Sequence, residues 1–106
     1  MREEKKKYLK NYLLQETKIE RLERMCLLNP ENIEKYKDEI TKADNLRINI
    51  ENSISQVKDP VLCELLYLKY VLGKTLEEIA LTLNYSKRHI ERLHIKALEQ
   101  FEINCE

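Results

Sequence analysis

The segment from residue 86 to residue 98 combines hydrogen-bond donors, an acceptor and an apolar side chain at helical spacing. If this segment is a helix with a buried stripe centred on Ile90, a turn of about 100° per residue places its charged side chains on the opposite face. In the major groove of DNA, guanine presents acceptors, cytosine an amine donor and thymine a methyl group. Arginine, glutamate and isoleucine side chains match these three edges. The candidates for reading bases are therefore Lys87, Arg88, Glu91, Arg92 and Ile95.

A second set of residues has the chemistry to hold DNA phosphates. Lysine ammonium groups suit phosphates, and the amides at a helix N-terminus carry partial positive charge. The phosphate candidates are Lys74, Thr75, Ser86, His89 and Lys96. The plainer alternative is that the cationic residues form only a solvated helix face.

Capping signals predict that a short helix and a tight turn precede the basic helix. Thr75 and Glu78 stand in the capping-box relation, so a helix can begin directly after Thr75. Asn84 tolerates the left-handed conformation that ends a helix, and Ser86 is a good N-cap for the next one. The predicted recognition helix covers about residues 86–103. A short helix, a tight turn and a longer basic helix form a helix-turn-helix, which lays its second helix in the major groove.

Composition and apolar spacing predict an all-α fold. The 106 residues include 1 Gly and 2 Pro, and 36% of them are charged, which favours long amphipathic helices. Apolar residues recur at helical spacing over residues 4–28 and 30–57, and the second segment has the narrow seam of a coiled coil. Asn29-Pro30 breaks the first helix and caps the second, with Pro30 at a first helical position. Residues 1–58 are therefore expected to form a long, coiled-coil-like antiparallel helical hairpin that serves oligomerisation.

Residues 59–106 are predicted to form a three-helix domain that contains the helix-turn-helix. Asp59 is expected to cap its first helix, with Pro60 in the first turn and Gly73 at the end. This helix has a wide apolar arc, so we expect it at the centre of the domain. A domain of this size buries a small fraction of its surface. Support from the second hairpin helix or from another subunit is therefore expected.

Charge and cysteine usage limit the classes of function. The formal net charge is +0, so no global field draws the chain onto polyanions, although four cations oppose one carboxylate between residues 86 and 98. The three cysteines lack paired spacing, which predicts neither a disulfide framework nor a zinc site. Free thiols without a signal peptide indicate the cytoplasm, here of a bacterial host. The apolar stretch 61–72 is interrupted by Glu64 and Lys69, so no membrane span is expected.

The histidines do not form a pattern typical of catalysis or metal binding. His89 and His94 are five residues apart, roughly 140° around a helix, so they cannot share one ion as a pair four apart can. His94 falls beside the core stripe and is predicted to be packed and hydrogen-bonded. The sequence has no nucleophile–base grouping and no phosphate-cradling glycine loop. We therefore expect no enzyme activity, no cofactor and no metal.

Short blocks of the C-terminal half resemble region four of bacterial sigma factors, the region that binds promoters. These blocks are residues 66–70, residues 76–80, Ser86 and Ala97-Leu98. More narrowly, residues 84–94 with Ala97-Leu98 are similar to small sigma-like proteins of phages and prophages, related to the ArpU and RinA type of late-gene regulators.

The resemblance implies a transcription regulator that binds double-stranded DNA. It places Lys87, Arg88, Glu91 and Arg92 where sigma factors contact the promoter −35 element. Arg88 stands where primary sigma factors commonly have an acidic residue, and Glu91 where they have a basic one, so the recognised sequence is expected to differ. Bacterial RNA polymerase is an implied partner.

Three functions from different classes remain open. The first is a phage or prophage regulator that binds DNA as a homodimer joined through the hairpin, reading two half-sites. The second is a DNA-packaging component similar to a small terminase subunit, which also joins a helix-turn-helix to an oligomerising hairpin. The third is a protein-interaction module that docks on RNA polymerase without contacting DNA. Oligomer size separates the first two, and duplex binding separates both from the third.

Overall fold

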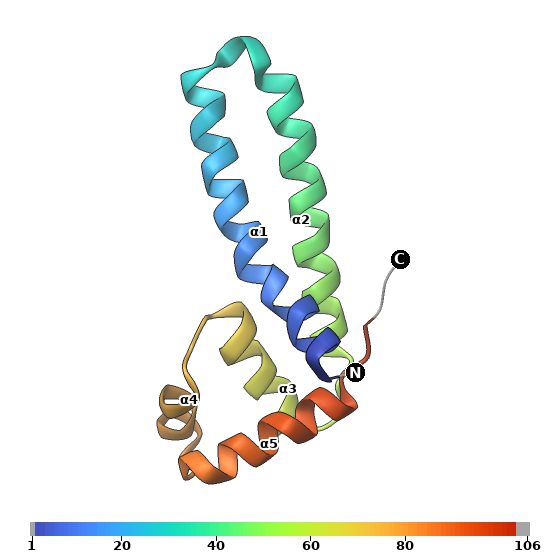
Figure 1. The fold of residues 1–106 in the computed structure, drawn as a ribbon, viewed down its shortest axis with the longest axis vertical. Coiled ribbons are helices and arrows are strands. Elements are labelled where there is room, and N and C mark those ends of the chain that lie inside the picture. The colour runs from blue at the N-terminus through green and yellow to red at the C-terminus, as the bar shows by residue number, and fades with distance from the viewer. Residues whose placement is uncertain (1, 104–106) are drawn as a thin grey trace.

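The computed structural model describes residues 2–103; Met1 and residues 104–106, which include Cys105, lie outside the described residues. The predicted all-α fold is confirmed, with a long antiparallel hairpin followed by three shorter packed helices. In Figure 1 the hairpin extends away from these helices, and the molecule measures 52 × 28 × 21 Å. The elements are α1 (Arg2–Leu28), η1 (Pro30–Asn32), α2 (Ile33–Ser55), α3 (Pro60–Leu66), η2 (Tyr67–Val71), α4 (Leu76–Leu83) and α5 (Lys87–Gln100). Within residues 2–103, no helix combines the length and the apolar character that crossing a membrane requires.

The turn between α1 and α2 differs from the prediction. Pro30 begins a 3₁₀ turn instead of the second helix, and the Asn29 side chain makes no capping hydrogen bond. Helix α2 starts at Ile33, and its N-cap residue Asn32 also makes no side-chain cap. At its other end α2 stops at Ser55, before the predicted boundary near Val57. A proline that fits the first position of an α-helix fits a 3₁₀ turn equally well, because both need φ near −65°.

A polar layer interrupts the apolar contact between α1 and α2. The Arg47 guanidinium donates to Asp44 Oδ1 at 2.6 Å and lies 4.0 Å from Glu16 Oε1 on α1. Next to it, Tyr12 Oη donates to Glu51 Oε1 at 3.0 Å. Burial and this carboxylate raise the pKa of Tyr12 to about 12. Polar positions in a helical seam specify which residues pair, so this layer fixes the register of the hairpin.

The first helix of the C-terminal half contains a π-helical segment that the sequence pattern did not predict. As expected, Asp59 caps α3 by accepting from the amides of Val61 and Leu62, and Gly73 ends the segment with φ +72°. Between these points, the amide of Leu72 donates to the carbonyl of Tyr67 in the i→i+5 pattern of a π-turn. The extra residue in this turn is compatible with burying both Tyr70 and Val71 while Leu72 stays half exposed.

The largest core joins the base of the hairpin to the C-terminal helices. It contains side chains from both hairpin helices, from α3 and η2, and from the end of α5: Leu9, Tyr12, Ile50, Ile54, Val57, Leu62, Leu66, Tyr70, Val71, Ala97, Leu98 and Phe101. The support expected from the second hairpin helix is present, and α1 adds to it. Lys5 on α1 also donates from Nζ to the carbonyls of Leu98 at 2.9 Å and Glu99 at 3.3 Å. A cation at these carbonyls complements the negative end of the α5 dipole. The expected boundary at residues 58–59 falls between α2 and α3, and the core crosses it.

Candidate nucleic-acid interface

The caps predicted around α4 and α5 are all present. Thr75 Oγ1 accepts from the amide of Glu78 at 3.2 Å, and Glu78 Oε1 accepts from the amide of Thr75 at 2.9 Å, which completes the capping box. Asn84 adopts the left-handed conformation, with φ +62° and ψ +46°. Ser86 Oγ then accepts from the amide of His89 at 3.1 Å and starts α5. Two helices joined by the three residues 84–86 therefore form a helix, turn, helix unit whose bends are fixed by local bonds.

The predicted recognition helix is shorter than expected. It was predicted over residues 86–103, but α5 covers Lys87–Gln100, and Phe101 has extended backbone angles of φ −72° and ψ +133°. The Phe101 side chain is fully buried, 6.1 Å from the Tyr8 ring between centroids. Helix α5 ends here because two contacts take the place of another helical turn. Phe101 packs against Tyr8 on α1, and Lys5 donates to the carbonyls of Leu98 and Glu99.

The two faces of α5 divide as predicted from the helical spacing. The buried stripe contains Ile90, His94, Ala97 and Leu98. On the opposite side Arg88, Glu91, Arg92 and Ile95 are all exposed, and 43% of Ile95 is accessible. Within residues 2–103, neither Arg88 nor Arg92 takes part in a salt bridge or a side-chain hydrogen bond. Their donors therefore face solvent on a helix held rigidly from behind.

Lys87 differs from the other base-reading candidates. Its Nζ lies 3.6 Å from Glu77 Oε1 on α4, and both side chains are largely exposed. Such surface pairs contribute about 0–1 kcal/mol and exchange readily for another anion. Lys87 is therefore directed along the side of the helix unit, while the two arginines project from its free face.

The phosphate candidates fall at two separate places. Ser86, His89 and Lys96 belong to α5 or its cap, and the half-buried His89 ring meets Tyr85 edge-on at 4.9 Å between centroids. Lys74 and Thr75 precede α4 instead. The Thr75 amide is already bonded to Glu78, and Glu77 adds a second carboxylate to this first turn. The start of α4 is therefore a poorer anion site than the start of α5, whose first turn carries no acidic residue.

His94 is packed and hydrogen-bonded, as predicted. Its Nε2 and Tyr70 Oη form a buried hydrogen bond of 2.7 Å. Burial, followed by the charges of Lys69 and Lys6, lowers the pKa of His94 to about 4, and burial raises the pKa of Tyr70 to about 12. At neutral pH both groups are uncharged, so this pair fixes η2 to α5 without adding charge to the interface.

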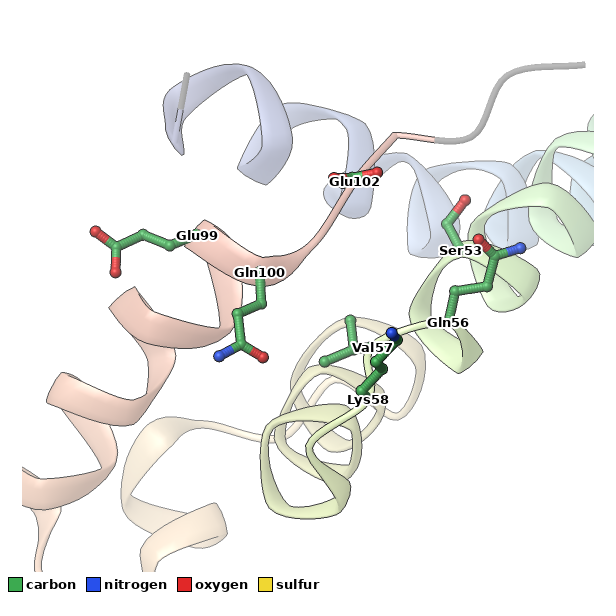
Figure 2. A pocket seen from close by; sticks show the side chains of 7 residues that line it. All are labelled: Ser53, Gln56, Val57, Lys58, Glu99, Gln100 and Glu102. Atoms are coloured by element: carbon green, nitrogen blue, oxygen red, sulfur yellow. The ribbon is translucent and has the colours of Figure 1, made fainter.

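A polar depression of about 500 Å³ lies at the other end of α5, away from the arginines. Figure 2 shows that its lining comes from the end of α2 with the following turn, and from the end of α5 with the residues after it. The lining residues are Ser53, Gln56, Val57, Lys58, Glu99, Gln100 and Glu102. Val57 is its one apolar side chain. The depression therefore lacks the apolar walls that bind small molecules.

The described part of the chain contains no group of three His, Cys, Asp or Glu side chains that could hold a metal ion. Comparisons of the chain with protein-family models, with curated proteins and with solved structures find no match. The geometry of α4 and α5 and the residues they expose are therefore the structural features that indicate a function.

Three lysines whose charges interact were not among the residues predicted from the sequence. Lys6 and Lys10 lie on α1 and Lys69 lies in η2, and the charges of the first two act on the third. The run of lysines at residues 5–7 was a visible signal, but its position relative to α5 depends on the packing of α1 against the C-terminal helices.

Proposed function

We propose that this protein is a sequence-specific, double-stranded DNA-binding transcription regulator of the phage or prophage type, with α5 in the major groove. The observation that carries the proposal is the exposed face of α5, where Arg88 and Arg92 are free to donate. Glu91 and Ile95 lie on the same face and match a cytosine amine and a thymine methyl. The regulator class comes from the sequence resemblance to sigma-like phage proteins.

The contacts that fix both ends of α5 support this role. A helix that reads base edges needs a rigid orientation, and both the Ser86 cap and the left-handed Asn84 fix the direction in which α5 starts. Its other end is fixed by the buried Phe101 and by Lys5. The net charge is +0, so no overall attraction draws the protein to a polyanion. Affinity for DNA must therefore come from the local surface around α5.

The proposal includes a homodimer joined through the hairpin. Helix-turn-helix proteins commonly read two half-sites about one helical turn apart, which requires two copies held at a fixed distance. Apolar side chains on the outside of the hairpin are exposed and support this arrangement: Leu14, Leu27, Leu28 and Ile48. Mass in solution tests it, since a dimer fits a regulator and a ring of many subunits would favour a packaging role.

The test is selection of binding sites from random duplex DNA, followed by titration of the selected duplex. We expect Arg88→Ala and Arg92→Ala each to cost about 1–3 kcal/mol and to relax the preference at one base position. The chain offers a matched control in Arg21→Ala with Arg24→Ala, two exposed arginines on the part of α1 near the hairpin turn. This control removes arginine charge away from α5 and should leave both affinity and preference unchanged.

Two outcomes would contradict the proposal. One is the absence of any duplex binding, which would favour a module that docks on RNA polymerase through protein contacts alone. The other is equal binding by the wild type and both α5 variants at every salt concentration, which would remove α5 as the reading element.

A further inference from the structure

The base of the hairpin carries a second positive surface beside α5. Lys6, Lys10 and Leu13 are spaced by four and three residues, which places them on one face of α1. Leu13 Cδ1 lies 3.4 Å from the position that a Cβ on Gly73 would occupy. This face of α1 is therefore turned toward the end of η2, the segment that carries Lys69. We call Lys6, Lys10 and Lys69 the α1–η2 lysine cluster.

Contacts through Tyr70 place this cluster at the side of α5. Lys69 Nζ lies 5.6 Å from the centre of the Tyr70 ring, and the Tyr70 hydroxyl is hydrogen-bonded to His94 on α5. On the same side, Glu77 of α4 interacts with Lys69 and pairs with Lys87 at the start of α5. The cluster is therefore connected to the first residue of α5 through one shared carboxylate, that of Glu77.

The electrostatics of the cluster are unfavourable in the free protein. Burial, followed by the charges of Lys10 and Lys6, lowers the pKa of Lys69. Within residues 2–103, two carboxylates interact with the cluster: Glu3 lies 3.6 Å from Lys6, and Glu77 is shared between Lys69 and Lys87. The repulsion among these three ammonium groups is only partly offset by the two carboxylates, so it destabilises the folded protein slightly. A bound polyanion would remove this destabilisation.

We propose that the α1–η2 lysine cluster binds DNA phosphates that flank the site read by α5. This inference rests on the proposed function and extends the interface from the helix-turn-helix to the base of the hairpin. A helix in the major groove, which is about 12 Å wide, has a phosphate backbone along each of its sides. Lysines on long flexible stems are suited to such phosphates, which position a protein without reading sequence.

The test measures how duplex affinity depends on salt in the triple variant Lys6→Gln, Lys10→Gln and Lys69→Gln. The probes are the duplex selected by the wild type and an unrelated duplex of equal length. The slope of log K against log salt should become shallower by about 0.9 for each phosphate that the variant no longer neutralises. Affinity for both duplexes should fall by a similar factor, with the selected base preference unchanged.

Matched variants separate phosphate binding from a structural effect. The control Lys35→Gln, Lys37→Gln and Lys42→Gln removes three exposed lysines from the half of α2 near the hairpin turn and should keep the wild-type slope. Without DNA, the cluster variant should melt no lower than the wild type, because its removal relieves repulsion. If Lys69→Gln nevertheless disturbs the packing, the double variant Lys6→Gln with Lys10→Gln changes α1 alone and should still reduce the slope.

The outcomes distinguish this inference from the proposed function. An unchanged slope in the cluster variants, with loss of preference in the Arg88 and Arg92 variants, would overturn the cluster and leave α5 as the reader. A changed base preference in the cluster variants would also overturn a phosphate role. If the wild type binds no duplex at all, both proposals fail.

Discussion

Two of the connections between helices in this chain, the turn from α1 to α2 and the turn from α4 to α5, are built differently. The turn from α4 to α5 is fixed by a capping box before α4, a left-handed Asn84 and a Ser86 cap. The turn from α1 to α2 has two asparagines at cap positions, yet neither side chain makes a capping hydrogen bond. Next to this turn, 83% of Leu27 and 64% of Leu28 are exposed.

The difference indicates where the orientation of a helix is controlled. At the hairpin turn, the direction of α2 is set by its long contact with α1, so the turn needs only to be short. Helix α4 has 8 residues and α5 has 14, so the contact area between them is too small to fix their relative direction. Local hydrogen bonds in the turn must fix it instead. The candidate interface is therefore the better-specified region, and the hairpin turn is the more tolerant one.

The largest expected effect contrasts the buried end of α5 with the exposed hairpin turn. Phe101→Ala should lower the free energy of unfolding by about 3–5 kcal/mol, because it leaves a cavity where α1, α3 and α5 meet. At a protein concentration at which the chain is monomeric, Leu27→Ala near the hairpin turn should change it by less than about 0.5 kcal/mol. Chemical denaturation followed by circular dichroism measures both values.

Phe101→Leu provides a second measurement if the alanine variant does not fold. It keeps most of the apolar volume and should cost clearly less than Phe101→Ala. A cost for Leu27→Ala equal to that of Phe101→Ala would show that the two regions are equally packed, contrary to the comparison.

The parts of the fold predicted correctly from sequence depend on neighbours in the chain. Asp59, Thr75 with Glu78, and Ser86 each cap through a side chain that reaches an amide two or three residues away. The left-handed Asn84 has an equally local cause, because its short polar side chain tolerates positive φ. Helical spacing likewise separated the buried Ile90 stripe from the exposed arginines.

The parts not predicted depend on contacts between distant segments. The π-turn in η2 forms where Tyr70 meets His94, 24 residues further along the chain. Helix α5 ends at Gln100 because Phe101 packs against Tyr8, which is far away in sequence. The lysine cluster has the same origin, since Lys69 meets Lys6 and Lys10 only after α1 packs against η2. Periodicity within one segment contains no information about such partners.

An intermediate effect is expected for the pH dependence of the join between η2 and α5. The pKa of His94 is about 4 in the folded protein, against about 6.5 in an unfolded chain. The unfolded chain therefore binds more protons between these values. The contribution of neutral His94 is complete above about pH 6.5 and is lost as the pH falls toward 4. After allowance for solvent screening, we expect a loss of about 2 kcal/mol across this window.

His94→Gln isolates this effect from the titration of carboxylates. Glutamine can still bond to Tyr70 but has no charge to gain, while Lys69 and Lys6 remain beside it. Unfolding measured at several pH values should give curves for the wild type and the variant that run parallel above about pH 6.5 and differ in slope below it. Parallel curves down to pH 4 would mean that His94 is not held neutral by its surroundings.

The smallest expected effect compares the N-cap residues of the two turns, Ser86 before α5 and Asn32 before α2. Ser86→Ala removes the acceptor of the His89 amide and should cost about 1 kcal/mol, the usual value of a side-chain N-cap. Asn32→Ala removes a side chain that makes no capping hydrogen bond, so it should be nearly neutral. The two positions are otherwise comparable, because Ser86 directly precedes a helix of 14 residues and Asn32 directly precedes one of 23. Ser86→Asp keeps an acceptor in place and should restore the stability that alanine loses. Because all three changes are at N-cap positions, helix propensity contributes little to the difference. Equal costs for Ser86→Ala and Asn32→Ala would therefore mean that the direction of α5 is set by packing, as that of α2 is.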